Sequence, residues 1–228
     1  PLTFTPSNWD TPQTATVTGQ NDNIIDDNIV STITISVDDA NSDNDFDSVG
    51  DQTVQVTTSD DDVAGFTLAV VNANISGGIT VTEAASSGTF TAVLNAKPYT
   101  NVVLTVTSPD TGEVTVSPST LTFTSENWNT TQTVTVTGVD DNIIDGNINT
   151  TISVDVVDGS SDNNFHGLSP QTVTVTTSSD DVAGFTIVQS DGSTSVGEAG
   201  TTDTFTVVLN AQPASNVVLT LTSSDTGE

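Results

Sequence analysis

The sequence predicts an all-β protein made of tandem immunoglobulin-like antiparallel β-sandwiches of about seven strands each. Three observations support this fold class. Apolar residues alternate with β-branched threonines in runs such as 133–137 and 172–176, the pattern of strands with one buried and one solvated face. Turn signals such as Pro109-Asp110 and Asp158-Gly159 recur at short intervals, as they do in two-sheet sandwiches. The sequence shows no 3.6-residue apolar period, so amphipathic helices are not expected.

A long internal repeat divides the 228 residues into three units. Residues 8–28 return almost unchanged at 127–147, an offset of 119, and the offset shortens to 115 towards the C-terminus. A repeat of this length is a whole domain copied in tandem. The predicted units are the C-terminal half of one repeat (1–62), a complete repeat (63–181) and the N-terminal half of a further repeat (182–228).

Seven strands are expected in the complete repeat. The first, 65–82, is interrupted around Ser76-Gly77-Gly78, because glycine weakens a strand interior. The other six are expected at 89–95, 102–107, 121–124, 131–138, 150–156 and 171–177. If successive strands run up and down, the first, third, fifth and seventh all finish at the same pole of the sandwich.

The charge of the chain is one-sided and excludes several partners. One basic residue against 30 acidic ones gives a formal net charge of −29, so the chain cannot neutralise the phosphates of a nucleic acid or of an anionic membrane. No apolar stretch approaches the roughly 18 residues of a membrane span, and membrane insertion is not expected. The absence of Cys excludes disulfides and thiolate metal sites.

Seven carboxylates follow the strands that finish at this common pole. Glu83 ends the first strand, and Asp110 follows the third. The other five come after the fifth and seventh strands: Asp140, Asp141, Asp145, Asp180 and Asp181. A hard cation such as Ca²⁺, which takes 6–8 oxygen ligands, would relieve the repulsion between them. The alternative is a solvated acidic tip, because an Asp in a turn commonly caps local backbone N–H groups.

At these positions the chain resembles the Calx-β family, which includes domains of sodium–calcium exchangers and of bacterial surface proteins. The matching segments are 64–66, 110–112 and 139–145, together with Glu83 and the acidic pair 180–181. The resemblance implies that the seven carboxylates are Ca²⁺ ligands and that the carbonyl of Ile143 is a further one. Exchanger domains usually carry another acid just after the position of Asp145, where this chain has 146–148 without one, so one ion is expected to be lost or weakened.

The two half-repeats carry incomplete versions of the same set of ligands. The N-terminal half has Asn21 in place of the first paired acid. Its remaining candidate ligands are Asp22, Asp26, Asp60, Asp61 and Asp62. The C-terminal half supplies Glu198 and Asp225. Each set lacks the partners that the other half of a repeat contains, so each is expected to form only part of a metal site.

Three further residues attract attention for their chemistry. Trp9 and Trp128 precede the fifth strand of their repeats, and we expect them to anchor a core that is otherwise rich in Val and Thr. Lys97 lies at the pole opposite the acids, where it could pair with 60–62 of the preceding unit.

The chain has no Cys, a single His and no Ser beside a base, so we expect no enzymatic activity.

The organisation of the sequence favours a structural function. The leading hypothesis is a segment of an extracellular or cell-surface fibre, stalk or adhesin, rigidified by calcium at the domain poles and junctions. Its expected partners are neighbouring repeats of the same chain, with attachment to a cell surface or matrix through other parts of the full protein. Two alternatives stay open. Identical chains could join head to tail when their half-domains complete each other, or the chain could be a calcium-responsive regulatory module.

Overall fold

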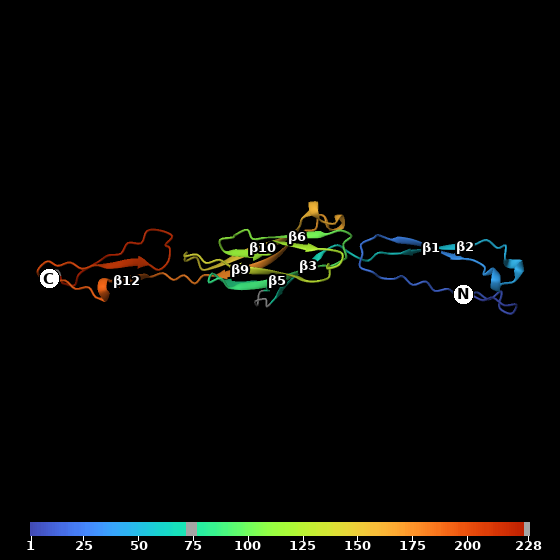
Figure 1. The fold of residues 1–228 in the computed structure, drawn as a ribbon, viewed down its shortest axis with the longest axis horizontal. Coiled ribbons are helices and arrows are strands. Elements are labelled where there is room, and N and C mark those ends of the chain that lie inside the picture. Colours follow the sequence, from blue (N-terminus) through green and yellow to red (C-terminus); the bar gives the residue numbers. More distant parts are fainter. Residues whose placement is uncertain (72–76, 226–228) are drawn as a thin grey trace.

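Two packed β-sheets, both supplied by residues 66–178, form the centre of the molecule (Figure 1). The computed structural model describes residues 1–71 and 77–225. The first sheet has the order β4-β11-β10-β6-β8, with β4 (Ile79–Thr82), β6 (Val102–Thr107), β8 (Thr120–Phe123), β10 (Asn147–Val156) and β11 (Gln171–Ser178). The second has the order β3-β5-β9-β7, with β3 (Phe66–Val71), β5 (Ser87–Leu94), β7 (Val114–Ser117) and β9 (Gln132–Gly138). The prediction of an all-β sandwich is confirmed.

The observed strands differ from the predicted ones in two places. The predicted first strand is two strands in different sheets: β3 pairs antiparallel with β5, whereas β4 pairs parallel with β11. The predicted break at Ser76 lies outside the described residues, as do 72–75 and 226–228. The second difference is β7, a four-residue strand on the edge of its sheet that is not among the seven predicted strands. Four residues are too short for a clear alternating pattern.

The core lies between the two sheets and is filled by the inward-facing residues of the alternating strands. Its largest fully buried side chains include Phe90, Phe123 and Phe165. Phe165 comes from a short 3₁₀ turn, η4 (Asn163–Phe165), in the loop between β10 and β11. Trp128 is half-buried and packs against this core, and its carbonyl accepts a hydrogen bond from the Leu94 N–H (3.1 Å). Trp128 therefore has the anchoring position expected of it.

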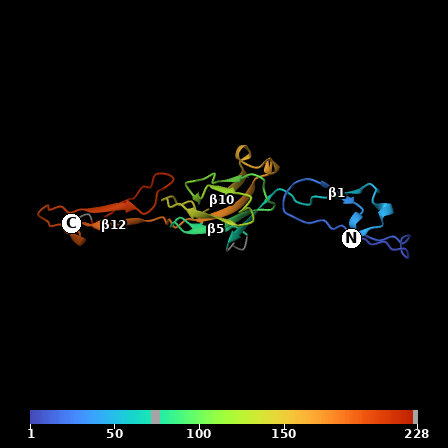
Figure 2. The ribbon, with the colours of Figure 1, turned by 45° about the vertical axis from the view of Figure 1, so that its right-hand side comes forward.

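A separate two-stranded sheet lies at each end of the molecule, and the two views show the three parts in a row (Figures 1 and 2). The N-terminal sheet pairs β1 (Ile29–Ile35) with β2 (Gln52–Thr58). The C-terminal sheet pairs β12 (Phe185–Gln189) with β13 (Phe205–Leu209). Four further 3₁₀ turns are η1 (Asp39–Asn41), η2 (Asn44–Phe46), η3 (Asp158–Ser160) and η5 (Ser190–Gly192).

Both end sheets use the strand pairing of the central sandwich. By the 119-residue offset β1 and β2 correspond to β10 and β11, and Ile33 lies opposite Val54 as Ile152 lies opposite Val173. In the same way β12 and β13 correspond to β3 and β5, with identical register. Within residues 1–71 and 77–225, no second sheet covers either end sheet. Trp9 is accordingly 71% exposed, unlike Trp128.

Candidate metal site

Glu83 is the buried centre of the acidic pole. It follows β4 directly, and its N–H donates to the carbonyl of Ser178 (3.1 Å), which prolongs the parallel pairing of β4 with β11. Only 1% of Glu83 is exposed. Its Oε2 accepts a hydrogen bond from the Asp180 N–H (3.3 Å), while Oε1 is buried and has no hydrogen-bond partner among the described residues. Leaving a carboxylate oxygen buried and unsatisfied is costly.

Four other carboxylates surround Glu83 in two overlapping groups. Oxygens of Glu83, Glu113 and Asp145 all lie within 4.8 Å of one another, and so do oxygens of Glu83, Asp180 and Asp181. Within the described residues, Oε2 of Glu113 and Oδ2 of Asp181 are also buried without a hydrogen-bond partner. These groups come from the end of β4, the start of β7, the loop before β10 and the end of β11. Glu113 and Asp181 belong to different groups, so a divalent cation in each group would be needed to give the orphaned oxygens a partner.

Burial and like charge raise the pKa of the central carboxyls. Burial raises the pKa of Glu83, and hydrogen bonds from Ser179 and Asp180 only partly oppose it. Burial also raises the pKa of Glu113, and the nearby negative charges, of which Asp145 and Glu83 act most strongly, raise it further. The only basic side chain of the protein, Lys97, lies on the loop at the opposite pole, between β5 and β6. No basic side chain therefore compensates the cluster.

Four of the seven acids predicted for this pole belong directly to the two groups: Glu83, Asp145, Asp180 and Asp181. The other three lie near enough to act through their charge, since Asp110 and Asp141 raise the pKa of Glu113, and Asp140 and Asp141 raise that of Asp181. Two of them also cap turns. Asp110 Oδ1 accepts from the Gly112 N–H (3.1 Å), and Asp141 Oδ1 accepts from the Ile143 N–H (2.7 Å).

The candidate ligands also include one backbone carbonyl, which was predicted, and one carboxylate, which was not. The carbonyl of Ile143, predicted as a ligand, accepts a hydrogen bond from the Asp145 N–H (3.0 Å) and keeps its second lone pair. Glu113 was missed by the sequence analysis. The sequence did contain a signal for Glu113, which ends the repeated phrase Asp110-Thr-Gly-Glu113. Its position at the pole, however, depends on β7, a strand that was not predicted.

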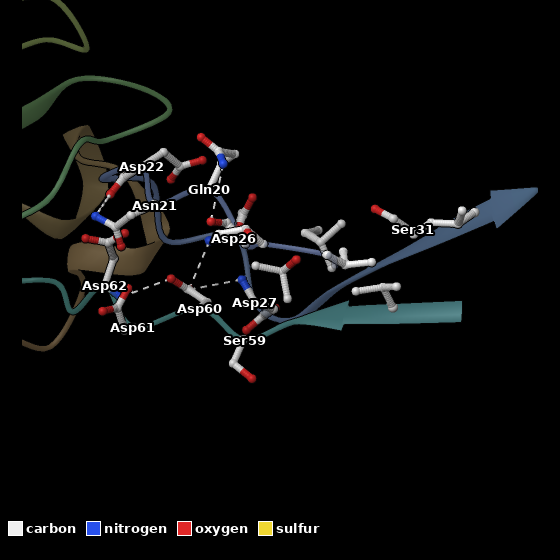
Figure 3. A pocket seen from close by; sticks show the side chains of 17 residues that line it. Gln20, Asn21, Asp22, Asp26, Asp27, Ser31, Ser59, Asp60, Asp61 and Asp62 are labelled. Atoms are coloured by element: carbon white, nitrogen blue, oxygen red, sulfur yellow. Dashed lines mark hydrogen bonds between the residues drawn. The ribbon is translucent and has the colours of Figure 1, made fainter. Parts of the chain in front are cut away.

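The N-terminal half shows the same acidic loop without the facing strands (Figure 3). Asp60 organises it: Oδ2 accepts from the N–H groups of Asp26 and Asp27 (both 3.2 Å), and Oδ1 accepts from the Asp62 N–H (3.0 Å). The pKa of Asp62 is raised, first by burial and then by the negative charges of neighbouring acids, among them Asp60, Asp61 and Asp22. Asp22, Asp26 and Asp61 line the pocket that Figure 3 shows, together with Asp60 and Asp62.

Neither half-repeat assembles a compact ligand group of its own. In the described part of the chain, both groups of three acids close enough to share an ion lie in the central sandwich. Glu198 and Asp225 are exposed, and the Asp225 N–H donates to Ser223 Oγ (3.2 Å).

The acidic loop of each unit also contacts the following unit through its backbone. The Lys97 N–H donates to the carbonyl of Asn23 (2.7 Å), where a side-chain ion pair with 60–62 was anticipated. At the second junction the Gln212 N–H donates to the carbonyl of Asn142 (2.6 Å). Both contacts are accompanied by a parallel β-bridge, Ile24 with Lys97 and Ile143 with Gln212. Because the contact is made by backbone atoms, it survives the change from Lys to Gln at this position.

No protein-family model and no curated protein sequence matches the chain. Solved structures similar to it include the apo form of a Calx CBD1 domain, at 14% identity over 51% of this chain and 98% of that one, with a TM-score of 0.34. Domains 4 and 5 of the S-layer protein SbsC are 25% identical over 56% of this chain and 59% of theirs, with a TM-score of 0.32. A Bacteroides ovatus GH5 xyloglucanase is 13% identical over 49% of this chain and only 19% of its own length, with a TM-score of 0.32.

Helical membrane spans were also sought. None of the helices in residues 1–71 and 77–225 has the length and apolar character to cross a bilayer.

The raised pKa values predict a pH-dependent stability of the metal-free protein. Because the pKa of Glu83 and Glu113 is higher in the folded chain than in the unfolded one, protonation favours the folded state. Their favourable contribution is complete below the ordinary carboxyl pKa of 4.5 and is lost as the pH rises through the raised folded values. In chelator, the melting temperature from scanning calorimetry should therefore rise when the pH is lowered from about 7 to about 5. A constant or falling melting temperature would contradict this assignment.

Proposed function

We propose that this chain is a structural segment of an extracellular fibre, stalk or adhesin whose sandwiches bind Ca²⁺ at the acidic pole. The observation that carries the proposal is the set of three buried carboxylate oxygens without hydrogen-bond partners among the described residues, on Glu83, Glu113 and Asp181. Two ligand groups share Glu83, so the pole offers more oxygens than one carboxylate pair. Ca²⁺ accepts 6–8 oxygens in irregular geometry, whereas Mg²⁺ demands a near-ideal octahedron and retains waters.

The same loop that supplies ligands also makes the junction to the next unit. Asn142 and Ile143 lie between the candidate ligands Asp141 and Asp145, and they contact Gln212 of the following unit. An ion that orders this loop therefore also orders the junction. Since binding to an ordered state stabilises that state by mass action, calcium stiffens the array.

An extracellular location fits this mechanism. Extracellular calcium modules bind the ion with dissociation constants of about 10⁻⁴–10⁻³ M, so they are filled outside cells and empty in the cytosol. The partners in this proposal are neighbouring repeats of the same chain, with a cell surface or matrix reached through other parts of the full protein. A calcium-responsive regulatory module would use the same ligands, so the decisive test measures order at the junction as well as binding.

Removing the junction hydrogen bond should uncouple the two units. In Gln212→Pro the N–H that donates to Asn142 is lost, whereas Gln212→Ala removes only the side chain. The chain has no Cys, so cysteines introduced at the exposed residues Thr122 and Thr206 would be the only sites for spin labels. We expect pulsed electron resonance on dilute samples to give a narrow distance distribution for the wild type in calcium and a broader one in chelator.

The two variants distinguish the contribution of the Gln212 backbone N–H to the junction from that of the Gln212 side chain. Gln212→Ala should match the wild type, and Gln212→Pro should stay broad even in calcium, with the melting temperature of the central sandwich unchanged. Equal widths of the distance distribution for the wild type in calcium and in chelator would contradict the stiffening mechanism, even if calcium binds.

A further inference from the structure

Strand β4 packs against the end of the second sheet at two glycines. A Cβ atom at Gly88, on β5, would collide with the side chain of Ile79 at the start of β4. A Cβ atom at Gly138, the last residue of β9, would collide with the backbone carbonyl of Thr82 at the end of β4. Of these two contacts, the one at Gly138 joins backbone to backbone. Glycine at this position therefore lets the two sheets approach closely at the acidic pole.

The contact at Gly138 lies between two carboxylates of the acidic pole, one from each sheet. Glu83 follows Thr82 directly in the chain, so its backbone moves with the strand end that touches Gly138. Glu113 is attached on the other side, where its carbonyl accepts a hydrogen bond from the Val139 N–H (2.9 Å). The distance between the two side chains is therefore set by how closely Thr82 approaches Gly138.

The two ligand groups depend on this gap to different degrees. Glu113 precedes β7 of the second sheet, and it forms the cross-sheet group with Glu83 and Asp145, whose oxygens lie within 4.8 Å of one another. The other group consists of Glu83, Asp180 and Asp181, which follow β4 and β11, two strands paired in the first sheet. A wider separation of the sheets would open the cross-sheet group and leave the other group intact.

We infer that Gly138 is a positioning residue that sets the gap between Glu83 and Glu113 and so fits the cross-sheet group to Ca²⁺. The inference rests on the proposed function, because it concerns the ion that the acidic pole binds. Ca²⁺ bonds to oxygen at about 2.3–2.6 Å and Mg²⁺ at about 2.0–2.1 Å, whereas Sr²⁺ is larger than both. A wider gap would lengthen the bonds from Ca²⁺ to one of the two sheets, while Sr²⁺ would still reach both.

Alanine at position 138 is the smallest change that widens the gap. Gly138 is not one of the glycines with a positive φ, so Gly138→Ala introduces a contact without straining its own backbone. The added methyl group displaces the Thr82 carbonyl, and Glu83 moves with it. Strand β11 follows β4, because the Glu83 N–H donates to the Ser178 carbonyl (3.1 Å). The substitution should therefore weaken binding at the cross-sheet group and favour the larger ion there.

Isothermal titration calorimetry of the 228-residue chain with calcium and with strontium, at about 0.15 M salt, tests the inference. In Gly138→Ala the calcium affinity of the cross-sheet group should fall about 10- to 100-fold, as is typical when a residue that positions metal ligands is changed. The strontium affinity should fall less, so the ratio of the calcium affinity to the strontium affinity decreases.

The matched control is Gly159→Ala, in the 3₁₀ turn η3 beyond the opposite end of β10. Apart from its chain neighbours, a Cβ atom at Gly159 would have no heavy atom of the described residues within 4 Å. Both affinities of this variant should match those of the wild type.

A second variant tests the gap even if Gly138→Ala fails to fold. Glu113→Asp withdraws the opposite carboxylate by one methylene group and leaves the contact between Gly138 and Thr82 unchanged, so it should lower the same ratio of affinities. A wild type that binds calcium, with an unchanged ratio in Gly138→Ala or in Glu113→Asp, would overturn the inference alone. A wild type that binds neither ion would overturn the proposed function, and the inference with it.

Discussion

Replacing Glu83 by Gln should raise the melting temperature in chelator and remove most of the gain that calcium gives. Glu83 is buried with one unsatisfied oxygen among other carboxylates, so removing its charge relieves repulsion and desolvation in the metal-free protein. The same charge attracts the cation. By the relation RT ln(1 + [L]/Kd), calcium at about ten times its dissociation constant contributes about 1.4 kcal/mol, and most of this stabilisation should be lost in Glu83→Gln. Scanning calorimetry in calcium and in chelator measures both effects.

The control is the same substitution at Glu126, an exposed residue in the turn between β8 and β9, away from the acidic pole. Glu126→Gln should leave both melting temperatures within about 2 °C of the wild type, because exposed surface changes usually alter stability by less than about 0.5 kcal/mol. If Glu83→Gln lowered the melting temperature in chelator, or kept the full calcium response, Glu83 would not be the centre of a metal site.

The second large effect is expected in the core. Phe123 is fully buried between the sheets, and Phe123→Ala should destabilise the central sandwich by about 3–5 kcal/mol through lost burial and a residual cavity. Urea unfolding followed by circular dichroism, at concentrations where the chain is monomeric, measures the change in the free energy of unfolding.

The repeat supplies its own control for this substitution. Phe4 occupies the corresponding position of the N-terminal unit but is more than half exposed. Phe4→Ala should change the free energy of unfolding of the monomer by less than about 0.5 kcal/mol. Equal losses for the two variants would show that the N-terminal unit has a packed core of its own, contrary to the structure.

The fold class follows from local patterns, and the misses lie where tertiary context decides. Alternation of apolar residues with threonine located β5, β6, β9, β10 and β11 to within a few residues of their observed ends. The passage of the first strand from one sheet to the other could not be read from sequence, because β3 and β4 carry the same alternating pattern whichever sheet they join. The four-residue β7 is defined mainly by its pairing with β9.

The candidate site was predictable to the extent that strand ends define it. Glu83, Asp145, Asp180 and Asp181 follow strands whose direction was correctly inferred, so their convergence could be foreseen. Glu113 instead precedes an unpredicted strand, and its burial follows from the packing of β7 against β9. Whether these residues and the outlying Asp110, Asp140 and Asp141 bind an ion is a prediction that binding measurements must decide.

The central claim is that calcium is the cation of the acidic pole, and scanning calorimetry of the unmodified 228-residue chain tests it most directly. Three samples are compared at about pH 7 and 0.15 M salt: with millimolar calcium, with the same concentration of magnesium, and with chelator. The central sandwich should melt at least several degrees higher in calcium than in chelator, and magnesium should reproduce only a small part of the gain. Identical melting temperatures in calcium and in chelator would contradict the claim.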